Sequence, residues 1–379
     1  MTTNKNHNSP NVPNLRFPEF EGEWKIVSLQ EIASINPKSE PLQNRFFYID
    51  LEAVEKGELR KIQEILQEEA PSRAQRVINN NDILFQCVRP YQKNNYIHKE
   101  PNTSMTQWVA STGYAQIRTT ESPNYIYHLL NTDGFNRKVM VRCTGSSYPA
   151  INSEDLSTIH FYLSTDKNEQ CKIARLLDLL DERIATQNKI IERYESLIRG
   201  IAQHCIKEST SGKTYVKLGD ICQITTGKLD ANAQVDNGIY PFFTCAEQPF
   251  KINSFAFDTE ALLISGNGAN LGYINYYKGK FNAYQRTYVL DLFSENIQYI
   301  KWALKVLLPK RIAIEKSSSN TPYIVLSTLT DLRLPIPCKS KQGFIANLMQ
   351  SLERKLSNQI AQYDSYNYLK QYLLRQMFI

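Results

Sequence analysis

Apolar residues recur at alternating intervals of four and three along the middle of the chain. The positions are Ile173, Leu177, Leu180, Ile184, Gln187, Ile191, Tyr194, Ile198 and Ile201, and Gln187 is the polar member. Such a spacing, kept for about four heptads, is typical of a helix that pairs with another helix, and one polar seam position is a known means of fixing register. The pattern therefore predicts a paired helix, in preference to an amphipathic helix packed on its own domain.

The hydrophobic pattern also occurs twice. Three sets of residues match at a constant offset within each set: Leu29, Ile32 and Ile35 with Leu218, Ile221 and Ile224; Pro149, Ile151 and Leu156 with Pro322, Ile324 and Leu329; Ile173, Ala174, Leu176 and Leu180 with Ile345, Ala346, Leu348 and Leu352. The period is far longer than the roughly 20 to 50 residues of a solenoid repeat, so it indicates a duplicated module. Two related modules predict one molecule with two related binding ends.

A second apolar stripe lies within residues 339–379. It comprises Leu348, Leu352, Leu356, Tyr363, Tyr366, Leu373 and Met377, and Gln359 and Lys370 interrupt its heptad spacing. Duplicated halves joined head to tail are best related by a pseudo-twofold axis, which makes their two helices antiparallel. We therefore expect the two helices to pair as an antiparallel coiled coil.

The remaining segments combine short apolar runs with turn signals, as expected for mixed α and β structure. Strands are predicted at 83–85, 114–117, 261–264, 273–276 and 288–292, and helices over 125–130 and over 299–308, where Pro309 should end the helix. The predicted class is α+β: two mixed α/β domains separated by two long helices, with a pseudo-twofold internal duplication. The predicted boundaries are a disordered N-terminal tail at 1–14, a first domain at 15–164, a central helix at 165–208, a second domain at 209–338 and a C-terminal helix at 339–379.

Composition narrows the class of protein only slightly. The 379 residues include 44 lysines and arginines and 38 aspartates and glutamates, and the net charge of +6 permits a polyanionic partner without requiring one. The seven cysteines show no CxxC spacing, which favours a reducing compartment over a disulfide framework or a zinc cage. The N-terminus lacks the apolar core of a signal peptide, and no run approaches the roughly 18 to 20 apolar residues of a membrane span. The sequence thus predicts a cytoplasmic protein.

Familiar catalytic motifs are incomplete. The segment 212–214 would end a phosphate-binding loop only with glycine at position 207, where Lys207 stands. The glycine-rich segment 265–272 lacks dinucleotide-binding spacing, and a strand rather than a helix is expected after it. None of the five histidines has metal-ligand spacing. Together these features favour a binding protein without a catalytic or metal site.

Two pairs of polar loops carry groups suited to DNA recognition. Basic side chains can neutralise phosphates, and arginine and asparagine can bind guanine and adenine edges bidentately. Segment 82–85 corresponds to segment 261–264, so the loops that follow them should be equivalent. The candidate DNA-contacting residues are Arg89, Tyr91, Lys93, Asn94, Asn95, Arg142, Ser146, Ser147, Asn267, Asn270, Lys278, Lys280, Gln285, Arg286, Lys316 and Asn320. Asn, Ser and Gly clusters are also ordinary turn formers, but their recurrence at matching places favours DNA contact.

With these motifs in place, the chain resembles the specificity subunit of a type I restriction–modification system, the HsdS family. The resemblance extends over nearly the whole chain from Asn14. Its segments are LRFPEFEGEWKIVSLQEIASI at 15–35, DILFQCVRPYQ at 82–92, VASTGYAQIR at 109–118, SSYPAINSEDLSTI at 146–159, EQCKIARLLDLLDERIATQNKIIERYESLIRGI at 169–201, ALLISGNGANLGYINYYKGKFNAYQRTYVL at 261–290 and the terminal helix. No single motif is diagnostic, but their order and duplication are specific.

The resemblance implies two target recognition domains, each of which recognises one half of a split double-stranded DNA site. It also implies that the long helices act as a spacer and as docking surfaces for two methyltransferase (M) subunits, with restriction/translocase (R) subunits joining through them. S-adenosylmethionine, ATP and magnesium would then be bound by partner subunits, and no cofactor by this chain.

Two other interpretations remain open from the sequence. One is a self-contained DNA-modifying enzyme, such as a nuclease or a methyltransferase. The other is a coiled-coil scaffold that does not bind DNA. Activity of the purified chain with S-adenosylmethionine and magnesium would favour the first, and the absence of salt-dependent DNA binding would favour the second.

Overall fold

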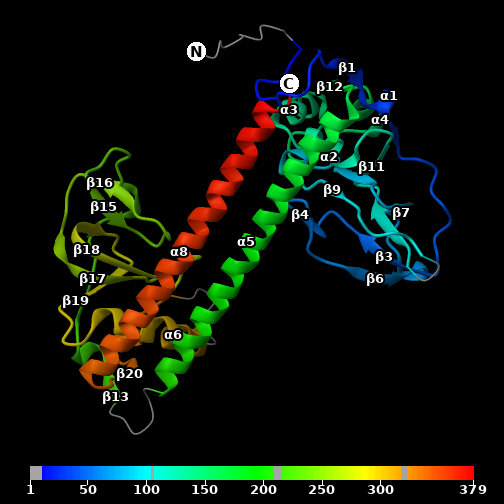
Figure 1. Ribbon diagram of the computed structural model, residues 1–379. Coiled ribbons are helices and arrows are strands. Elements are labelled where there is room, and N and C mark those ends of the chain that lie inside the picture. Colours follow the sequence, from blue (N-terminus) through cyan, green and yellow to red (C-terminus); the bar gives the residue numbers. More distant parts are fainter. Residues whose placement is uncertain (1–10, 104–105, 209–214, 317–322) are drawn as a thin grey trace, which may run out of the picture. The chain divides into compact units, whose positions relative to one another are not determined.

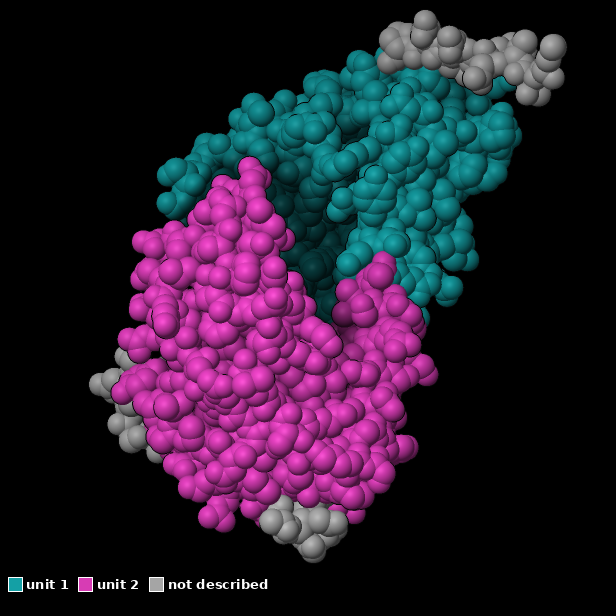
Figure 2. Space-filling view, turned by 90° about the vertical axis from the view of Figure 1, so that its left-hand side faces the viewer, with its two compact units in different colours: residues 1–187, 362–379 teal, residues 188–361 magenta. Residues whose placement is uncertain are grey.

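The computed structural model describes residues 11–103, 106–208, 215–316 and 323–379. The chain divides into two compact units, coloured separately in Figure 2: unit 1 comprises residues 1–187 and 362–379, and unit 2 comprises residues 188–361. The two longest helices, α5 (Lys167–Glu208) and α8 (Lys339–Gln376), contribute to both units. Each unit therefore contains a segment of both helices together with its own sheets (Figure 1).

Unit 1 is built on two four-stranded sheets. The first has the order β2-β11-β8-β9 with antiparallel neighbours throughout, and the second has the order β6-β3-β10-β7, in which β3 and β10 are parallel. The strands are β1 (Lys25–Ser28), β2 (Ala33–Ile35), β3 (Arg45–Ile49), β4 (Val54–Glu55), β5 (Glu58–Leu59), β6 (Gln63–Leu66), β7 (Ala74–Val77), β8 (Ile83–Gln86), β9 (Tyr96–Ile97), β10 (Trp108–Ser111), β11 (Tyr114–Thr119) and β12 (His160–Leu163). The short helices are α1 (Leu29–Ile32), α2 (Pro123–Leu130), α3 (Asp133–Arg142), α4 (Ser153–Ser157), η1 (Gln67–Glu69) and η2 (Pro90–Gln92).

Strand β8 lies at the centre of unit 1 and is buried on both faces. Because side chains alternate along a strand, Ile83 and Phe85 point to one side and Leu84 to the other. Ile83 and Phe85 belong to the core that includes α2 and the first turns of α5, whereas Leu84 belongs to the core shared with Trp108 of the second sheet. The continuous apolar run ILF is thus the sequence signature of a strand covered on both sides.

Unit 2 has one six-stranded sheet of order β14-β19-β17-β18-β15-β16. Its strands are β14 (Gln223–Thr226), β15 (Tyr240–Phe243), β16 (Phe250–Ile252), β17 (Phe257–Ser265), β18 (Ile274–Ala283) and β19 (Thr287–Asp291), and β13 (Tyr215–Lys217) pairs separately with β20 (Arg333–Pro335). The helices are α6 (Ile297–Lys316) and α7 (Leu326–Thr330), with the turns η3 (Leu218–Asp220) and η4 (Ala231–Ala233). The five strands predicted across the two halves are confirmed: 83–85, 114–117 and 261–264 lie within β8, β11 and β17, whereas 273–276 and 288–292 each extend one residue beyond β18 and β19.

The predicted end of one helix was wrong. Helix α6 continues through Pro309 to Lys316. Proline removes one backbone N–H and crowds the preceding turn, so it usually ends or kinks a helix. Here Leu308 and Ile312 on either side of Pro309 are both buried in the core of unit 2. We infer that the burial of these residues stabilises the continued helix and outweighs the lost hydrogen bond.

Strand register confirms the internal duplication residue by residue. In unit 1, Ile117 of β11 pairs with both Ile35 and Ile83. In unit 2, Leu290 of β19 pairs with both Ile224 and Leu262. The sheet order β2-β11-β8-β9 is therefore equivalent to β14-β19-β17-β18. This register also aligns Ile83 with Leu262, as the correspondence of segments 82–85 and 261–264 predicted.

The loops that follow β8 and β17 are held in the same way. The backbone N–H of Ile151 donates to the carbonyl of Cys87 at 3.0 Å, and the N–H of Ile324 donates to the carbonyl of Gly266 at 2.9 Å. Each bond joins the segment that follows β8 or β17 to a residue that comes after the second polar loop in the sequence. Each half therefore has the same backbone framework beneath its candidate DNA-contacting loops.

The two long helices pair in antiparallel fashion within each unit. In unit 1, Ile173 and Leu177 near the start of α5 share a core with Leu373 and Met377 near the end of α8. In unit 2 the order is reversed, since residues 198–206 of α5 share a core with residues 345–349 of α8. The predicted antiparallel pairing is thus confirmed. No helix in the described ranges is long and apolar enough to cross a membrane.

The seam of α8 differs from the predicted one at a single position. Met349 is fully buried, whereas Leu348 is only partly buried, so Met349 and not Leu348 occupies the seam. The corrected seam keeps strict four–three spacing through Ile345, Met349, Leu352, Leu356, Gln359, Tyr363, Tyr366, Lys370, Leu373 and Met377. Gln359 and Lys370 are therefore polar seam positions, and Lys370 pairs with Asp181 of α5 at 2.5 Å. Because Leu348 and Met349 are adjacent and both apolar, the sequence pattern allowed either of them to occupy the seam.

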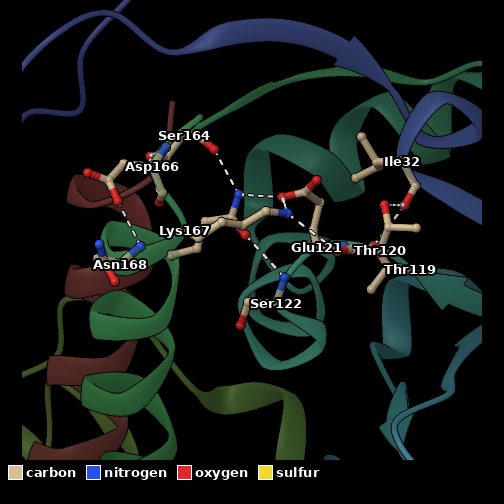
Figure 3. Close-up of polar contacts among 10 residues, drawn as sticks. Ile32, Thr119, Thr120, Glu121, Ser122, Ser164, Asp166, Lys167 and Asn168 are labelled. Carbon is tan, nitrogen blue, oxygen red and sulfur yellow. Dashed lines mark hydrogen bonds and ion pairs between the residues drawn. The ribbon is translucent and has the colours of Figure 1, made fainter.

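A buried glutamine fastens the first turn of α5 to unit 1. Gln170 Nε2 donates to Glu121 Oε2 at 2.7 Å and to the carbonyl of Ser164 at 2.8 Å, while its Oε1 accepts from the N–H of Ser122 at 3.1 Å. Lys167 pairs with the same Glu121. Figure 3 shows Glu121, Ser122, Ser164 and Lys167 of this set, with Glu121 lying between the first turn of α5 and the start of α2. We call this set the helix clamp of unit 1.

The first turn of α8 has an equivalent helix clamp in unit 2. Gln342 Nε2 donates to Glu295 Oε2 at 2.6 Å and to the carbonyl of Pro337 at 2.9 Å, and its Oε1 accepts from the N–H of Asn296 at 3.0 Å. Lys339 pairs with Glu295 at 2.9 Å. Both glutamines are almost fully buried. The joint between domain and helix is thus built twice from the same residue types.

Candidate nucleic-acid interface

Loop 87–95 of unit 1 presents an arginine stacked on a tyrosine. The guanidinium carbon of Arg89 lies 4.3 Å from the ring centroid of Tyr148, and the Arg89 N–H donates to the carbonyl of Pro149 at 2.8 Å. Tyr91 and Tyr148 are 51% and 64% exposed. The structure therefore brings the two predicted loops of the first half together. An arginine and two exposed rings at one place can contact phosphates or base edges and can stack on bases.

The backbone of this loop is held in an uncommon conformation. Arg89 and Lys93 both have φ of 53°, in the left-handed region that non-glycine residues rarely adopt. The two residues flank the turn η2. Asn136 of α3 donates from Nδ2 to the carbonyl of Pro90, at the first position of that turn, at 3.1 Å. The strained loop is thus supported from α3 beneath it.

Three predicted DNA-contacting residues in this loop form hydrogen bonds with other residues of unit 1. Lys93 Nζ donates to Asp133 Oδ1 at 2.7 Å, and this ion pair lowers the pKa of the Asp133 carboxyl group. The Oδ1 of Asn94 accepts from the N–H of Lys56 at 3.0 Å. Asn95 is 2% exposed, and its amide bonds to the Gln86 N–H and to the Asn131 side chain. In this conformation Asn95 faces the interior of unit 1.

The second predicted loop of this half also contains both exposed residues and a residue that bonds to the protein. Ser146 and Ser147 are exposed. Arg142 donates from Nη1 to the carbonyl of Asp155 at 2.8 Å and to Thr158 Oγ1 at 2.7 Å. Tyr148 was not among the predicted site residues. An aromatic residue directly after two serines and before a proline was the signal in the sequence that could have indicated it.

In unit 2 three predicted residues gather around Cys245. The Sγ of Cys245 lies 3.0 Å from Asn267 Oδ1 and 3.6 Å from the carbonyl oxygen of Arg286, and Asn270 Nδ2 donates to the carbonyl of Cys245 at 3.0 Å. Gln285 and Arg286 are exposed beside this cluster. Cys245 was not predicted, because nothing in the pattern around it distinguishes it from the other cysteines.

A glycine makes this convergence possible. A Cβ atom on Gly266 would lie 2.5 Å from the backbone oxygen of Arg286, closer than real Cβ contacts occur. Gly268 and Gly272 in the same turn have φ of 79° and 82°. The glycine-rich turn therefore lets loop 266–273 and the turn before β19 approach each other directly, as backbone without side chains can.

The remaining predicted residues of unit 2 lie elsewhere. Lys278 and Lys280 are on β18, where Lys278 lies 3.5 Å from Glu260 and the Lys280 ammonium lies 4.7 Å from the Phe255 ring centroid. Both are exposed and lie two residues apart, hence on one face of the strand. Lys316 is the last residue of α6, and Asn320 lies outside the described residues.

The described ranges contain no group of three or more His, Cys, Asp or Glu side chains that could hold a metal ion. What the two halves share is the equivalent framework described above, with exposed polar loops at the same end of it. An arginine, Arg89 or Arg286, stands at this end of each half.

The family model of the type I restriction modification DNA specificity domain matches residues 21–196 and, a second time, residues 210–363. The chain belongs to this family. It carries two copies of the specificity domain, and this membership does not favour the alternative of a self-contained DNA-modifying enzyme. The two matches also correspond to the duplication that the strand register shows.

Relatives in the type I specificity family match over different lengths. The chain is 44% identical over 137 residues to the EcoDI specificity subunit of Escherichia coli, a match that covers 36% of this chain and only 30% of that relative. A type I specificity subunit of Mycoplasma genitalium is 22% identical over 279 residues, covering 67% of this chain and 70% of the relative. The most similar stretch is therefore confined to about a third of the chain.

Solved structures show the same fold over almost the full length. The S subunit of a type I restriction–modification system from M. genitalium superposes with a TM-score of 0.67 at 17% identity, covering 97% of this chain and 99% of that one. A chain from a study of complex assembly and conformational transition of the type I system gives a TM-score of 0.59 at 22% identity, covering 93% and 96%. At these identities the likeness extends to the fold alone.

Proposed function

We propose that this chain is the non-catalytic DNA-recognition subunit of a type I restriction–modification complex, acting in the cytoplasm. Residues 15–164 and 209–338 are assigned as two target recognition domains, each recognising one half of a bipartite site. The observation that carries the proposal is the equivalence of the two halves in strand register, with an arginine at the same end of each framework, Arg286 exposed and Arg89 partly exposed.

DNA contact in the first domain is assigned first to Arg89, Tyr91, Ser146, Ser147 and Tyr148. In the second domain it is assigned to Asn267, Asn270, Gln285 and Arg286, with Lys278 and Lys280 as candidate phosphate contacts. Lys93, Asn94, Asn95, Arg142, Lys316 and Asn320 remain predictions. The charged and aromatic character of the exposed groups supports this assignment, because phosphates attract cations and unpaired ring faces can stack.

We propose that the helices determine the gap between half-sites and dock two methyltransferase subunits, through which restriction subunits join. S-adenosylmethionine, ATP and magnesium would be bound by those partners. Leu197 of α5 and Leu369 of α8 support docking of two copies of one partner. They occupy equivalent positions in the duplication and are 51% and 43% exposed, and exposed apolar residues on a paired helix are suited to protein contact.

Methylation mapping tests the proposal. The chain is produced together with its methyltransferase partner, and methylated positions in the DNA are mapped for the natural chain, for Arg89→Ala and for Arg286→Ala. We expect a split motif, with Arg89→Ala changing the first half and Arg286→Ala changing the second. A continuous motif, or methyl transfer by the purified chain without a partner, would contradict the proposed function.

A further inference from the structure

The carboxylate of Asp133 joins two cations in unit 1. Asp133 Oδ1 accepts from Lys93 Nζ at 2.7 Å, and Asp133 Oδ2 accepts from Arg375 Nε at 3.1 Å. Lys93 ends the turn η2 in the candidate DNA-contacting loop, and Arg375 lies in the last turn of α8. One carboxylate thus links loop 87–95 to a helix that follows the second domain in the sequence.

Packing holds Asp133 and Arg375 in place. Helix α3 starts from Thr132, whose Oγ1 accepts from the N–H of Phe135 at 3.2 Å, and Phe135 is buried in the core of unit 1. The last turn of α8 is anchored by Leu373 and Met377, which belong to the same core. The two ends of the link are therefore fixed independently of the loop between them.

The loop needs such support because of its backbone. Left-handed φ values at Arg89 and Lys93 persist only where surrounding contacts maintain them. Lys93 also donates from Nζ to the carbonyl of Asn131 at 3.1 Å, next to the start of α3. The ammonium of Lys93 is thus held by a carbonyl and a carboxylate, and Arg375 orients that carboxylate from its other oxygen.

We propose that Asp133 and Arg375 are positioning residues for the first half-site: through Lys93 they hold loop 87–95 in the conformation that presents Arg89 and Tyr91. The inference rests on the function proposed above and extends it, because recognition of the first half-site then depends on the last turn of the C-terminal helix. Within residues 106–208, 215–316 and 323–379, no ion pair links loop 266–273 of unit 2 to α5 or α8.

Hydrogen exchange of the full chain without DNA tests the link itself. In Arg375→Gln the amides of 87–95 should exchange about two- to fivefold faster, the range expected for loss of a partly exposed ion pair. The amides of 266–273 should keep their rate, and Arg375→Lys should restore most of the protection. The matched control is Lys339→Gln, which removes a similarly exposed ion pair from the first turn of α8 and should leave 87–95 unchanged.

DNA binding provides the second readout. Arg375→Gln should relax base selectivity in the first half-site by about two- to fivefold, leave the second half-site unchanged and leave the salt dependence of binding unchanged. A salt slope that falls by roughly 0.9 would make Arg375 a direct phosphate contact and overturn the positioning role.

The two readouts separate the inference from the proposed function. Unchanged exchange of 87–95 in both Arg375→Gln and Asp133→Asn overturns the inference, whatever the DNA results. Faster exchange of 87–95 alone in these variants supports the link. If the natural chain, together with its methyltransferase partner, then shows no bipartite recognition, the proposed function fails while the link stands.

Discussion

The two units resemble each other where domain meets helix and differ where DNA is expected. Gln170 and Gln342 make the same three kinds of hydrogen bond at the starts of α5 and α8. The loops diverge: unit 1 holds an arginine loop with salt links to α3, and unit 2 holds a glycine turn against Cys245. The duplicated framework therefore determines where the loops lie, while each loop is held by its own contacts.

Unit 1 also contains a buried polar cluster that unit 2 does not repeat. Glu169 is fully buried and accepts from Arg16 Nε at 2.6 Å, from Trp24 Nε1 at 3.1 Å and from Ser164 Oγ at 2.5 Å. At the equivalent position of α8 stands Lys341, which is partly exposed. The described part of the N-terminal segment contributes to unit 1, since the carbonyl of Asn11 accepts from the N–H of Trp24 at 2.9 Å.

The largest expected effect is an equal loss of stability when either of two equivalent seam residues is replaced by alanine. Leu177 and Met349 are both fully buried. Leu177→Ala and Met349→Ala should each lower the free energy of unfolding by about 2–5 kcal/mol, because each removes packed methylene groups and leaves a cavity. Denaturant unfolding measures the loss, and exchange rates assign it to unit 1 or unit 2. A cost under about 1 kcal/mol for Met349→Ala would restore Leu348 to the seam.

The next largest loss of stability is expected from changes to the helix clamps. Gln170→Leu and Gln342→Leu each remove three hydrogen bonds and leave a carboxylate without its amide partner, so each should cost about 1–3 kcal/mol. Unit-resolved hydrogen exchange should show the loss in unit 1 for the first variant and in unit 2 for the second. Gln203→Leu, at an exposed position of α5, is the matched control and should change little. Equal loosening of both units by one variant would contradict two independent clamps.

The role of Arg286 can be tested separately from that of the first loop. If Arg286 contacts a base, Arg286→Ala should cost about 1–3 kcal/mol of binding and relax one position in the second half-site. If it contacts phosphate, binding should weaken evenly and the salt slope should fall by roughly 0.9. Affinity titrations at several salt concentrations separate these cases. Unchanged affinity, slope and selectivity would remove Arg286 from the interface.

The last prediction concerns acid sensitivity, which should differ between the units. His98 is fully buried, and burial lowers its pKa to about 4. Between about pH 6.5 and 4 the unfolded chain binds a proton at this residue that the folded chain does not, so stability is lost as pH falls through this window. The loss should be at most about 1.4 kcal/mol per pH unit.

Unfolding measured across this pH range checks the prediction. His98→Gln replaces the imidazole with a side chain that does not titrate, so the pH dependence of unit 1 between 6.5 and 4 should become shallower. The single histidine of unit 2, His204, is exposed and serves as the control through His204→Gln. An unchanged slope in His98→Gln would assign the acid sensitivity to other groups.

Parts of the candidate site were predictable and parts were not. Arg89, Asn267 and Arg286 lie in loops that the strand pattern and the repeat located correctly. Asn95 belongs to the same polar run as Arg89, yet it is buried, because its amide completes the hydrogen bonds of Gln86 and Asn131. A run of polar residues in the sequence does not show which side chains are exposed. Here the left-handed backbone at Arg89 and Lys93 determines which way each side chain points.

The pattern of residues along the chain was enough to predict the duplication, five of the strands, the α5 seam and the antiparallel pairing of the helices. The strands and the seam follow from the spacing of apolar residues, which reflects the geometry of strands and helices. The antiparallel pairing follows from the pseudo-twofold relation of the duplicated halves. The tertiary structure decided the continuation of α6 through Pro309, the place of Met349 in the seam and the link from Lys93 to Arg375. Each of these depends on contacts between residues far apart in the chain. Contacts between distant segments exist only in the folded chain. They alone determine whether packing outweighs a local preference and whether one carboxylate binds two cations.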